Sequence, residues 1–218
     1  MQISLSINAT HGAEARALLS RAAMIVPAGG WVHIDVGDGA YTPRASWGDA
    51  AEFSAIRTAH PALGALAAEV HLMARDWADR IVPWLEAGVR RVIVPAALVP
   101  DLPYLSELSA RYGCEAMLSF SPQGAVVPDF AARYGAFRAF QVLAVFPGES
   151  GQQFDEAALP ALRAVRAAFP DAILEVDGGV TPGVLRRARD AGADCAVSSS
   201  FVWHAGDPQA AYEGLRKI

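Results

Sequence analysis

Residues 31–43 read WVHIDVGDGAYTP, and this stretch decides how the rest of the chain is interpreted. Its first five residues are mostly β-branched or aromatic and follow Gly29-Gly30, which predicts a strand over residues 31–35. Successive side chains of a strand point to opposite faces, so His33 and Asp35 share one face. An imidazole and a carboxylate side by side on a strand indicate a site for a cation.

Two later segments end in the same residue types. Residues 69–73, EVHLM, place a histidine at the end of a predicted strand, and residues 173–179, ILEVDGG, place an aspartate there. Two imidazoles and two carboxylates from three strands form a set of nitrogen and oxygen ligands for a divalent metal. The candidate ligands are His33, Asp35, His71 and Asp177.

Composition limits the class of protein. The chain has 218 residues, 53% of them hydrophobic, and a formal charge of −5. This suffices for a sizeable core, and we expect one domain over residues 1–218. The mild acidity argues against a nucleic-acid partner, and no apolar run is long enough to cross a membrane. Two cysteines, Cys114 and Cys195, and the lack of a signal peptide predict a reducing, cytoplasmic location.

Strand and helix signals alternate along the whole chain. We expect strands over residues 3–7, 31–35, 67–72, 91–94, 114–120, 139–145, 172–176 and 194–198. We expect helices over residues 13–25, 49–58, 76–85, 100–112, 129–134, 155–169, 181–191 and 207–215. Eight alternating units predict an α/β fold, a closed (β/α)8 TIM barrel, whose strand ends would bring the candidate ligands together at its mouth. An open doubly wound sheet is the alternative, and the missing GxGxxG after the first strand weakens it.

Five sequence blocks, taken in order, resemble the ribulose-phosphate 3-epimerase family. The blocks are Leu5-Ser6-Ile7, residues 33–43 (HIDVGDGAYTP), His71-Leu72-Met73, residues 145–154 (VFPGESGQQF) and residues 176–180 (VDGGV). They are similar to the family motifs PSIL, HxDxMDGxFxP, HLM, VxPGFGGQxF and VDGGV. The family is a (β/α)8 barrel, so the resemblance agrees with the fold expected from the alternation.

The resemblance implies a metal-dependent sugar epimerase that inverts carbon 3 of a ketose phosphate. The default reaction converts D-ribulose 5-phosphate to D-xylulose 5-phosphate, in the pentose phosphate pathway. The implied metal ligands are His33, Asp35, His71 and Asp177, and they suit zinc, iron(II), manganese or cobalt. Asp35 and Asp177 would also act as the two acid/base groups, because two carboxylates on opposite sides of a carbon can remove and return its proton. A cation would stabilise the ene-diolate intermediate.

The resemblance also implies a substrate site, and the sequence departs from the family there. Ser6 would orient the substrate or a ligand, and Met73 would form an apolar wall. Backbone N–H groups after strands seven and eight bind phosphate in such barrels. The predicted substrate-binding residues are Ser6, Met73, Gly148, Gly151, Gly178, Gly179, Ser199 and Ser200. However, Glu149 places a carboxylate where the family meets phosphate, and Ser199 replaces a family glycine. Family methionines are replaced by Gly37 and Leu143.

These departures leave three interpretations of the function open. The chain is a ribulose-phosphate epimerase, an epimerase of a hexulose phosphate or an unphosphorylated ketose, or a barrel that binds a sugar or metal without turnover. Each implies a small-molecule partner, and we expect a homo-oligomer.

Other polar residues and glycines have structural interpretations. The four glycines of the predicted phosphate site are equally compatible with plain turns. Asp38 is expected to bond local backbone N–H groups in a turn. The loop over residues 40–47 would close over the site or form a subunit contact. Arg90 and Arg91 precede a strand, and we expect both to be solvent-exposed at the opposite end of the barrel.

Overall fold

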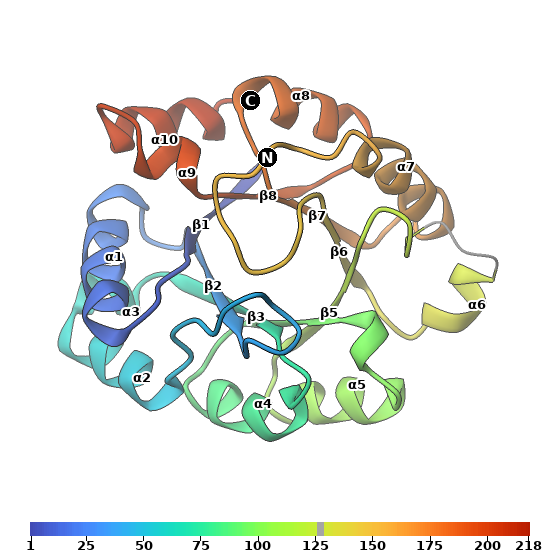
Figure 1. Cartoon of the computed structure of the whole chain (residues 1–218), viewed down its shortest axis with the longest axis horizontal. Coiled ribbons are helices and arrows are strands. Elements are labelled where there is room, and N and C mark those ends of the chain that lie inside the picture. The colour runs from blue at the N-terminus through green and yellow to red at the C-terminus, as the bar shows by residue number, and fades with distance from the viewer. Residues whose placement is uncertain (126–128) are drawn as a thin grey trace.

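Eight parallel strands form a closed barrel in which each strand pairs with its neighbours in the sequence and β8 pairs with β1. The computed structural model describes residues 1–125 and 129–218, and Figure 1 shows the ring of strands inside a ring of helices. The strands are β1 (Gln2–Ile7), β2 (Trp31–Gly37), β3 (Ala67–Met73), β4 (Arg91–Pro95), β5 (Glu115–Phe120), β6 (Ala139–Leu143), β7 (Ile173–Asp177) and β8 (Cys195–Ser198). The predicted (β/α)8 barrel is confirmed, and the open sheet is excluded.

Helices connect the strands and cover the outside of the barrel. They are α1 (Gly12–Ile25), α2 (Ala50–Ala59), α3 (Pro61–Gly64), α4 (Trp77–Glu86), α5 (Leu102–Arg111), α6 (Phe130–Tyr134), α7 (Ala158–Ala168), α8 (Pro182–Asp190), α9 (Ser200–Trp203) and α10 (Pro208–Arg216), with a 3-10 turn, η1, at Ala96–Leu98. All predicted helices are found, whereas α3, α9 and η1 were not predicted. Within the described ranges, no helix is both long enough and apolar enough to cross a membrane.

Several helices begin at a residue whose side chain caps them. Side chains at the first position accept a backbone N–H from the first turn and so satisfy a donor that the helix leaves unpaired. These capping residues are His11, Asp49, Asp101, Thr181 and Asp207. Proline follows within the first turn after Thr181 and Asp207, where its fixed φ suits a helix start.

Alternation along β1 separates an apolar outer face from a polar inner face. In β1, Ile3, Leu5 and Ile7 are fully or almost fully buried in the core between strands and helices. Ser4 and Ser6 lie between them in the sequence, on the other face, which is the inside of the barrel. The barrel interior therefore receives polar side chains even though the chain is rich in apolar residues.

The register between β2 and β3 gathers polar side chains of two strands on this inner face. His33 pairs with Glu69, and Asp35 pairs with His71. Paired residues of parallel strands point to the same side of a sheet, so all four enter the barrel. Asp177 is the last residue of β7 and lies at the same, carboxyl end of the barrel.

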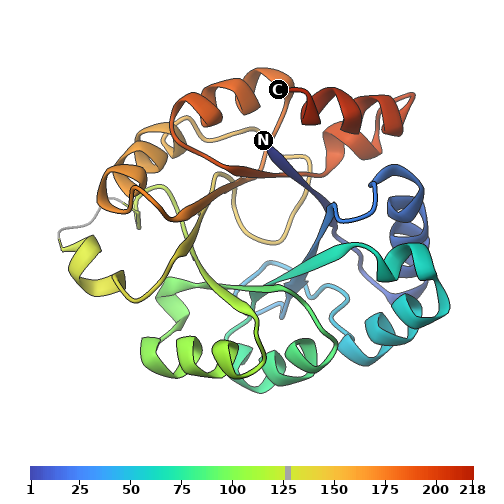
Figure 2. The ribbon, with the colours of Figure 1, turned by 180° about the vertical axis from the view of Figure 1, so that it is seen from behind.

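Residues near the C-terminus close the barrel against its first strand. Trp203 Nε1 donates a hydrogen bond of 2.7 Å to the carbonyl oxygen of Ser6, and the Tyr212 hydroxyl donates one of 3.1 Å to that of Ile3. Figure 2, the view from behind, shows that β1 lies next to β8 and that the chain ends lie on the same side of the ring. Contacts between the two ends of the sequence thus complete the fold.

An aromatic cluster anchors the loop between β2 and α2. The ring of Trp47 meets Trp84 of α4 edge-on at 6.1 Å between centroids, and Phe53 of α2 lies 5.3 Å from Trp84. Trp47 Nε1 also donates a hydrogen bond of 2.8 Å to Glu52 Oε2. The end of this loop is therefore fixed to the outer helices, while its start lies at the barrel mouth.

We expect the substitution Trp84→Ala to lower the free energy of unfolding by about 3–5 kcal/mol, because it leaves a cavity among Trp47, Phe53 and the core. Urea denaturation followed by circular dichroism measures this loss. The matched control is Tyr112→Ala, which truncates an exposed aromatic side chain and should change the stability by less than about 0.5 kcal/mol. Equal effects of the two substitutions would contradict the assignment of Trp84 to the core.

Candidate active site

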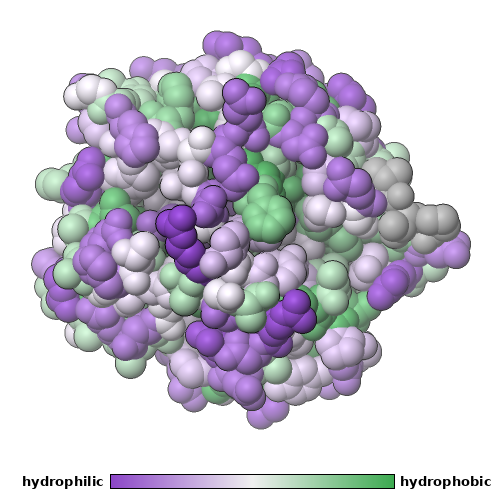
Figure 3. Space-filling model, in the orientation of Figure 1, coloured by the Kyte–Doolittle hydropathy of each residue, from purple (hydrophilic) through white to green (hydrophobic). Residues whose placement is uncertain are grey.

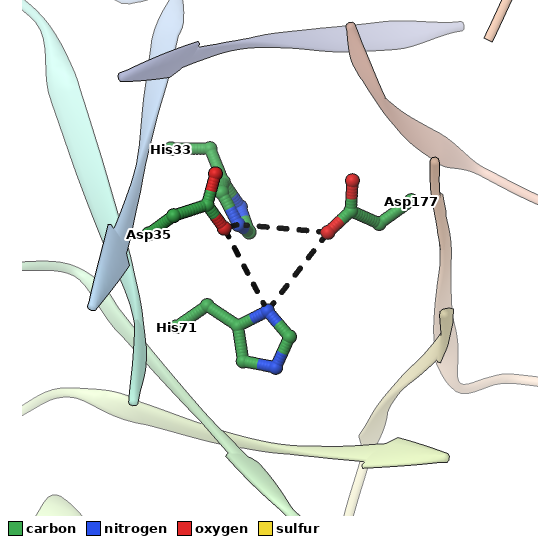
Figure 4. A group of neighbouring side chains, drawn as sticks. All are labelled: His33, Asp35, His71 and Asp177. Atoms are coloured by element: carbon green, nitrogen blue, oxygen red, sulfur yellow. Dashed lines mark hydrogen bonds and ion pairs between the residues drawn. The ribbon is translucent and has the colours of Figure 1, made fainter. Parts of the chain in front are cut away.

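Two histidines and two aspartates meet at the mouth of the barrel. His33 and Asp35 come from β2 and His71 from β3, and Asp177 of β7 faces Asp35 across the mouth (Figure 4). His33 Nε2 lies 3.2 Å from Asp35 Oδ1 and 3.8 Å from Asp177 Oδ2. His71 Nδ1 lies 4.0 Å from Asp35 Oδ1 and 3.8 Å from Asp177 Oδ2. The structure thus brings together the four residues that the sequence predicted as metal ligands.

The spacing of these donor atoms fits one divalent cation. One atom from each residue lies within 4.8 Å of all the others. Donors bound at about 2.1 Å in a tetrahedron lie roughly 3.4 Å apart, which is close to the separations found here. The histidine side chains are fully buried, whereas those of Asp35 and Asp177 are 12% and 14% exposed. The nitrogen donors therefore lie at the back of the site and the carboxylates on its open side.

The ring of His71 has the surroundings of a metal ligand. Both of its nitrogens are buried, and neither has a hydrogen-bond partner among the described residues. Burial and the positive charge of His33 lower the pKa of His71 to about 3, so the imidazole is neutral at physiological pH. A buried polar atom without a partner is unfavourable, and a cation bound to Nδ1 would remove that cost.

His33 is held from below by Glu69. Nδ1 of His33 donates a hydrogen bond of 3.0 Å to Glu69 Oε1, which leaves Nε2 directed at the two aspartates. Burial raises the pKa of Glu69, but its hydrogen bond to His33 and the charges of His33 and Arg91 outweigh burial and lower it to about 2. A carboxylate on the second nitrogen of a metal-binding histidine fixes its tautomer and orientation. Glu69 is therefore part of the site, although the sequence did not single it out.

The two aspartates have different environments. Burial of Asp177, opposed by the charge of His33 and reinforced by the Asp35 carboxylate, raises its pKa to about 7. Burial also disfavours the Asp35 carboxylate, but both histidines and a hydrogen bond from Ser6 outweigh it and lower its pKa. The Ser6 hydroxyl donates to Asp35 Oδ2 at 2.9 Å. The two carboxylates thus lie in different electrostatic surroundings, which shift their pKa values in opposite directions.

A pocket opens on Asp35 and Asp177. All residues predicted to bind substrate line it: Ser6, Met73, Gly148, Gly151, Gly178, Gly179, Ser199 and Ser200. Met73 and Leu143 supply apolar wall, and Leu143 pairs with Asp177 across β6 and β7. The structure brings the predicted residues to one pocket, and their contact with a substrate stays a prediction.

The loops after β2 and β6 meet over this pocket. Figure 1 shows the loop after β6 crossing the centre of the ring. A Cβ on Gly148, whose φ is +96°, would lie 2.7 Å from Thr42 Cβ, so glycine allows the loops to approach this closely. Arg44 Nη2 lies 3.6 Å from Glu149 Oε1 in a solvent-exposed ion pair. Such a pair contributes little stability, but it offsets the charge of Glu149 at the pocket entrance.

The surface around the entrance is mostly hydrophilic. Figure 3, in the orientation of Figure 1, shows hydrophilic side chains around a small hydrophobic area near the centre of this face. In the loop after β6, Phe146 is 63% exposed. Gln152 ties this loop together, because its amide donates to the carbonyl oxygens of Phe146 and Glu149 at 2.6 and 2.7 Å. The loop over the pocket is therefore held together by hydrogen bonds of its own.

Two residues at the start of the β2 loop have structural roles. Asp38 accepts hydrogen bonds of 2.7 Å from the backbone N–H groups of Tyr41 and Arg75, which confirms its predicted turn role and joins two loops. At Gly37, a Cβ would lie 2.5 Å from Thr42 Oγ1. The family methionine therefore has no room here with the loop in this position.

The prediction for Arg91 was wrong, whereas Arg90 is exposed as expected. Arg91 is the first residue of β4 and is only 2% exposed, because it pairs with Glu69 and points into the barrel. Three other buried, inward-facing residues were not predicted: Glu69, Gln141 and Glu175. Each of them lies two positions before another residue of the same strand face, namely His71, Leu143 and Asp177. This period of two is the signal in the sequence that could have placed them inside the barrel.

A second group of acidic and histidine side chains lies beneath the mouth. His33, Glu69 and Glu175 have donor atoms within 4.8 Å of one another. Arg91 Nη1 lies 2.8 Å from Glu69 Oε2 and 3.6 Å from Glu175 Oε2. The guanidinium is therefore the cation of this group, and the group needs no metal.

Comparisons with known proteins agree with this geometry. The model of the family described as "Ribulose-phosphate 3 epimerase family" matches residues 2–203. The ribulose-phosphate 3-epimerase of Mycobacterium bovis is 31% identical over 206 residues, covering 92% of this chain and 87% of that protein. The cytoplasmic isoform of Oryza sativa subsp. japonica is 28% identical over 191 residues, covering 86% and 81%. The crystal structure of 3-hexulose-6-phosphate synthase from Salmonella typhimurium has a TM-score of 0.68 at 17% identity, covers 100% of this chain and 97% of that chain, and shows likeness of fold alone.

We expect the protein to bind one equivalent of cobalt(II), and we expect His71→Ala to weaken this binding by at least about 100-fold, because a direct ligand is lost. Isothermal titration calorimetry of protein stripped with a chelator measures the affinity. His60→Ala is the control, since His60 is exposed and lies outside the candidate site. Unchanged affinity in His71→Ala would rule out His71 as a ligand.

Proposed function

The chain belongs to the ribulose-phosphate 3-epimerase family, and from this premise we propose that it inverts carbon 3 of D-ribulose 5-phosphate to give D-xylulose 5-phosphate. Family membership makes it an isomerase that acts on a carbohydrate. The observation that carries the finer proposal is the position of Asp35 and Asp177, which face each other across one pocket and belong to the same four-residue group.

We assign the proton transfers to Asp35 and Asp177. Carbon 3 lies next to the ketone, so loss of its proton gives an ene-diolate, and return of a proton on the opposite face inverts the centre. One aspartate removes the proton and the other donates one, and the reverse reaction exchanges their roles. The Ser6 hydroxyl holds the Asp35 carboxylate in place through the bond to Oδ2.

The four ligand residues suit zinc, iron(II), manganese or cobalt. His33, Asp35, His71 and Asp177 would hold the divalent cation, which would supply positive charge to stabilise the negative charge of the ene-diolate. The apolar side chains of Met73 and Leu143 limit water next to the reacting carbons. These residues together provide the electrostatics and the proton carriers that the reaction needs.

We propose that the phosphate lies at the part of the pocket lined by Gly178, Gly179, Ser199 and Ser200. Gly179 has a φ of +64°, and a Cβ there would lie 2.5 Å from the backbone N of Phe154, so the turn itself requires glycine. The hydroxyls of Ser199 and Ser200 line the same pocket and can donate hydrogen bonds to a phosphate. Glu149 also lines the pocket, but its partner Arg44 offsets its charge.

A different ketose is the second candidate substrate. Glu149 and Ser199 both line the pocket, and both depart from the family pattern in the segment that would hold phosphate. A carboxylate repels a phosphate dianion but accepts hydrogen bonds from sugar hydroxyls. The alternative substrate is therefore an unphosphorylated ketose or a hexulose phosphate, and its turnover is to be measured beside that of ribulose 5-phosphate.

Solvent exchange followed by NMR tests the reaction and the substrate together. Metal-loaded protein is incubated in D2O with ribulose 5-phosphate and, separately, with unphosphorylated ribulose. Deuterium at carbon 3 of the phosphorylated sugar would support the proposal, whereas exchange with the free sugar alone would favour the second candidate. No exchange with either sugar or with hexulose phosphates would overturn the assignment of an epimerase.

Three further expectations stay predictions. We propose that residues 1–218 form one domain, that the protein assembles into a homo-oligomer and that it works in the cytoplasm. Sedimentation velocity tests the oligomer, and a single cooperative unfolding transition tests the domain.

We expect Asp177→Asn to lower turnover by at least about 100-fold, because an amide cannot exchange the proton. Initial rates with ribulose 5-phosphate measure the loss, and a metal assay of the same sample separates lost proton transfer from lost metal. Asp171→Asn is the matched control, since Asp171 is exposed at the opposite end of β7. A near-normal rate for Asp177→Asn would refute its acid/base role.

We expect Glu149→Gln to lower the KM for ribulose 5-phosphate about two- to fivefold without changing kcat, because one negative charge leaves the entrance used by a dianion. Glu156→Gln removes an exposed charge outside the pocket and should leave KM unchanged. A higher KM in Glu149→Gln would indicate that Glu149 binds substrate hydroxyls instead, in favour of the second candidate.

A further inference from the structure

The barrel interior just below the mouth is unusually polar. The inward positions of β3, β4, β6 and β7 carry Glu69, Arg91, Gln141 and Glu175, which are 0–2% exposed. Branched apolar side chains ordinarily fill this space in such barrels. Buried charges are costly unless they are paired and hydrogen-bonded, so the contacts of these residues indicate what they do.

Arg91 is fixed from several directions at once. Its Nη1 donates to Glu69 Oε2 at 2.8 Å and lies 3.6 Å from Glu175 Oε2. Its Nε donates to Glu115 Oε2 at 2.8 Å. The guanidinium also stacks over the ring of Trp31 at 4.7 Å. Only a planar, forked cation can make these contacts together, so lysine could replace the charge but not the geometry.

One branch of contacts runs from Arg91 to the histidine side of the site. Glu69 uses Oε2 for Arg91 and Oε1 for Nδ1 of His33, at 2.8 and 3.0 Å. Since Glu69 cannot rotate without losing one of these bonds, the guanidinium fixes the plane of its carboxylate. The carboxylate in turn fixes the ring of His33 and the direction of Nε2.

A second branch runs from Arg91 to the opposite side of the site. Glu175 faces Arg91 with Oε2, and its Oε1 accepts a hydrogen bond of 3.0 Å from Gln141 Nε2. The same Gln141 amide donates to Asp177 Oδ2 at 3.4 Å, and its oxygen accepts a 2.6 Å bond from the Ser119 hydroxyl. Gln141 thus links the buried layer to the second aspartate.

We propose that Arg91 is a positioning residue that sets the relative placement of His33 and Asp177, through Glu69 on one side and through Glu175 and Gln141 on the other. Arg91 contacts neither the pocket nor the four candidate ligand atoms. It acts through its neighbours on the coordination geometry of the bound cation and on the affinity of the protein for that cation. The inference rests on the metal site proposed above, but it does not depend on which ketose the protein converts.

The alternative role for Arg91 is plain charge neutralisation of two buried glutamates. In that case Arg91→Lys would reduce stability and leave the metal site as it was. Arg166 supplies a matched control, because it also makes many bonds, donating to the carbonyl oxygens of Pro170, Ala172 and Gly192, but lies outside the pocket.

Cobalt(II) absorption in the visible range separates the two roles, because the bands depend on coordination geometry. We expect Arg91→Lys to weaken cobalt binding about 10- to 100-fold and to shift the bands, as loss of an outer partner of a metal ligand does. Arg166→Lys should lower the melting temperature and leave the spectrum and affinity unchanged. If Arg91→Lys behaves like Arg166→Lys, Arg91 only neutralises charge and the proposal is overturned.

A second variant keeps the test decisive should Arg91→Lys fold poorly. Gln141→Leu removes the link to Asp177 without changing the charge, and we expect it to shift the cobalt bands while leaving His33 and Glu69 paired. An unchanged spectrum in Gln141→Leu would overturn the branch to Asp177. If the wild-type protein binds no cobalt, both the metal site and this inference are overturned. If it binds cobalt but catalyses no exchange, only the epimerase assignment is overturned.

Discussion

Every second side chain of a closed barrel points towards its axis, where a charge loses contact with bulk water and must find a partner in the protein. Glu69 meets this constraint twice, with one carboxylate oxygen on His33 and the other on Arg91. The bond to His33 belongs to the candidate ligand group at the mouth, and the bond to Arg91 belongs to the buried layer. The site and the layer beneath it are therefore a single electrostatic unit, built from neighbouring strands.

The features that were predicted correctly depend on residues that lie close together in the sequence. His33 and Asp35 are two residues apart on one strand, so their shared face followed from the strand period. Eight alternating units predicted the barrel, and the barrel predicted that strand ends meet. Arg91 was misplaced because its surroundings depend on the register between β3 and β4, which places it beside Glu69. Next to another arginine at the start of a strand, it looked like a surface residue.

In the pocket, too, the residues were predicted from sequence motifs, whereas the contacts between distant loops were not. Family motifs predicted its lining, but not the contact between Gly148 and Thr42 that lets two loops meet above it. Nor did they predict that Arg44 lies beside Glu149, because these residues are far apart in the sequence. The short helices α3 and α9 were missed because four residues are too few to show a helical period.

The hydrogen bonds from Trp203 and Tyr212 to the backbone of β1 join residues separated by 197 and 209 positions. A ribosome releases β1 long before β8, so during synthesis one edge of β1 has no strand to pair with. Three of the four candidate ligand residues leave the ribosome well before Asp177 does. The nascent chain thus carries an open sheet edge and an incomplete set of candidate ligands until β7 and β8 have been made, and the barrel can close only after β8 has emerged.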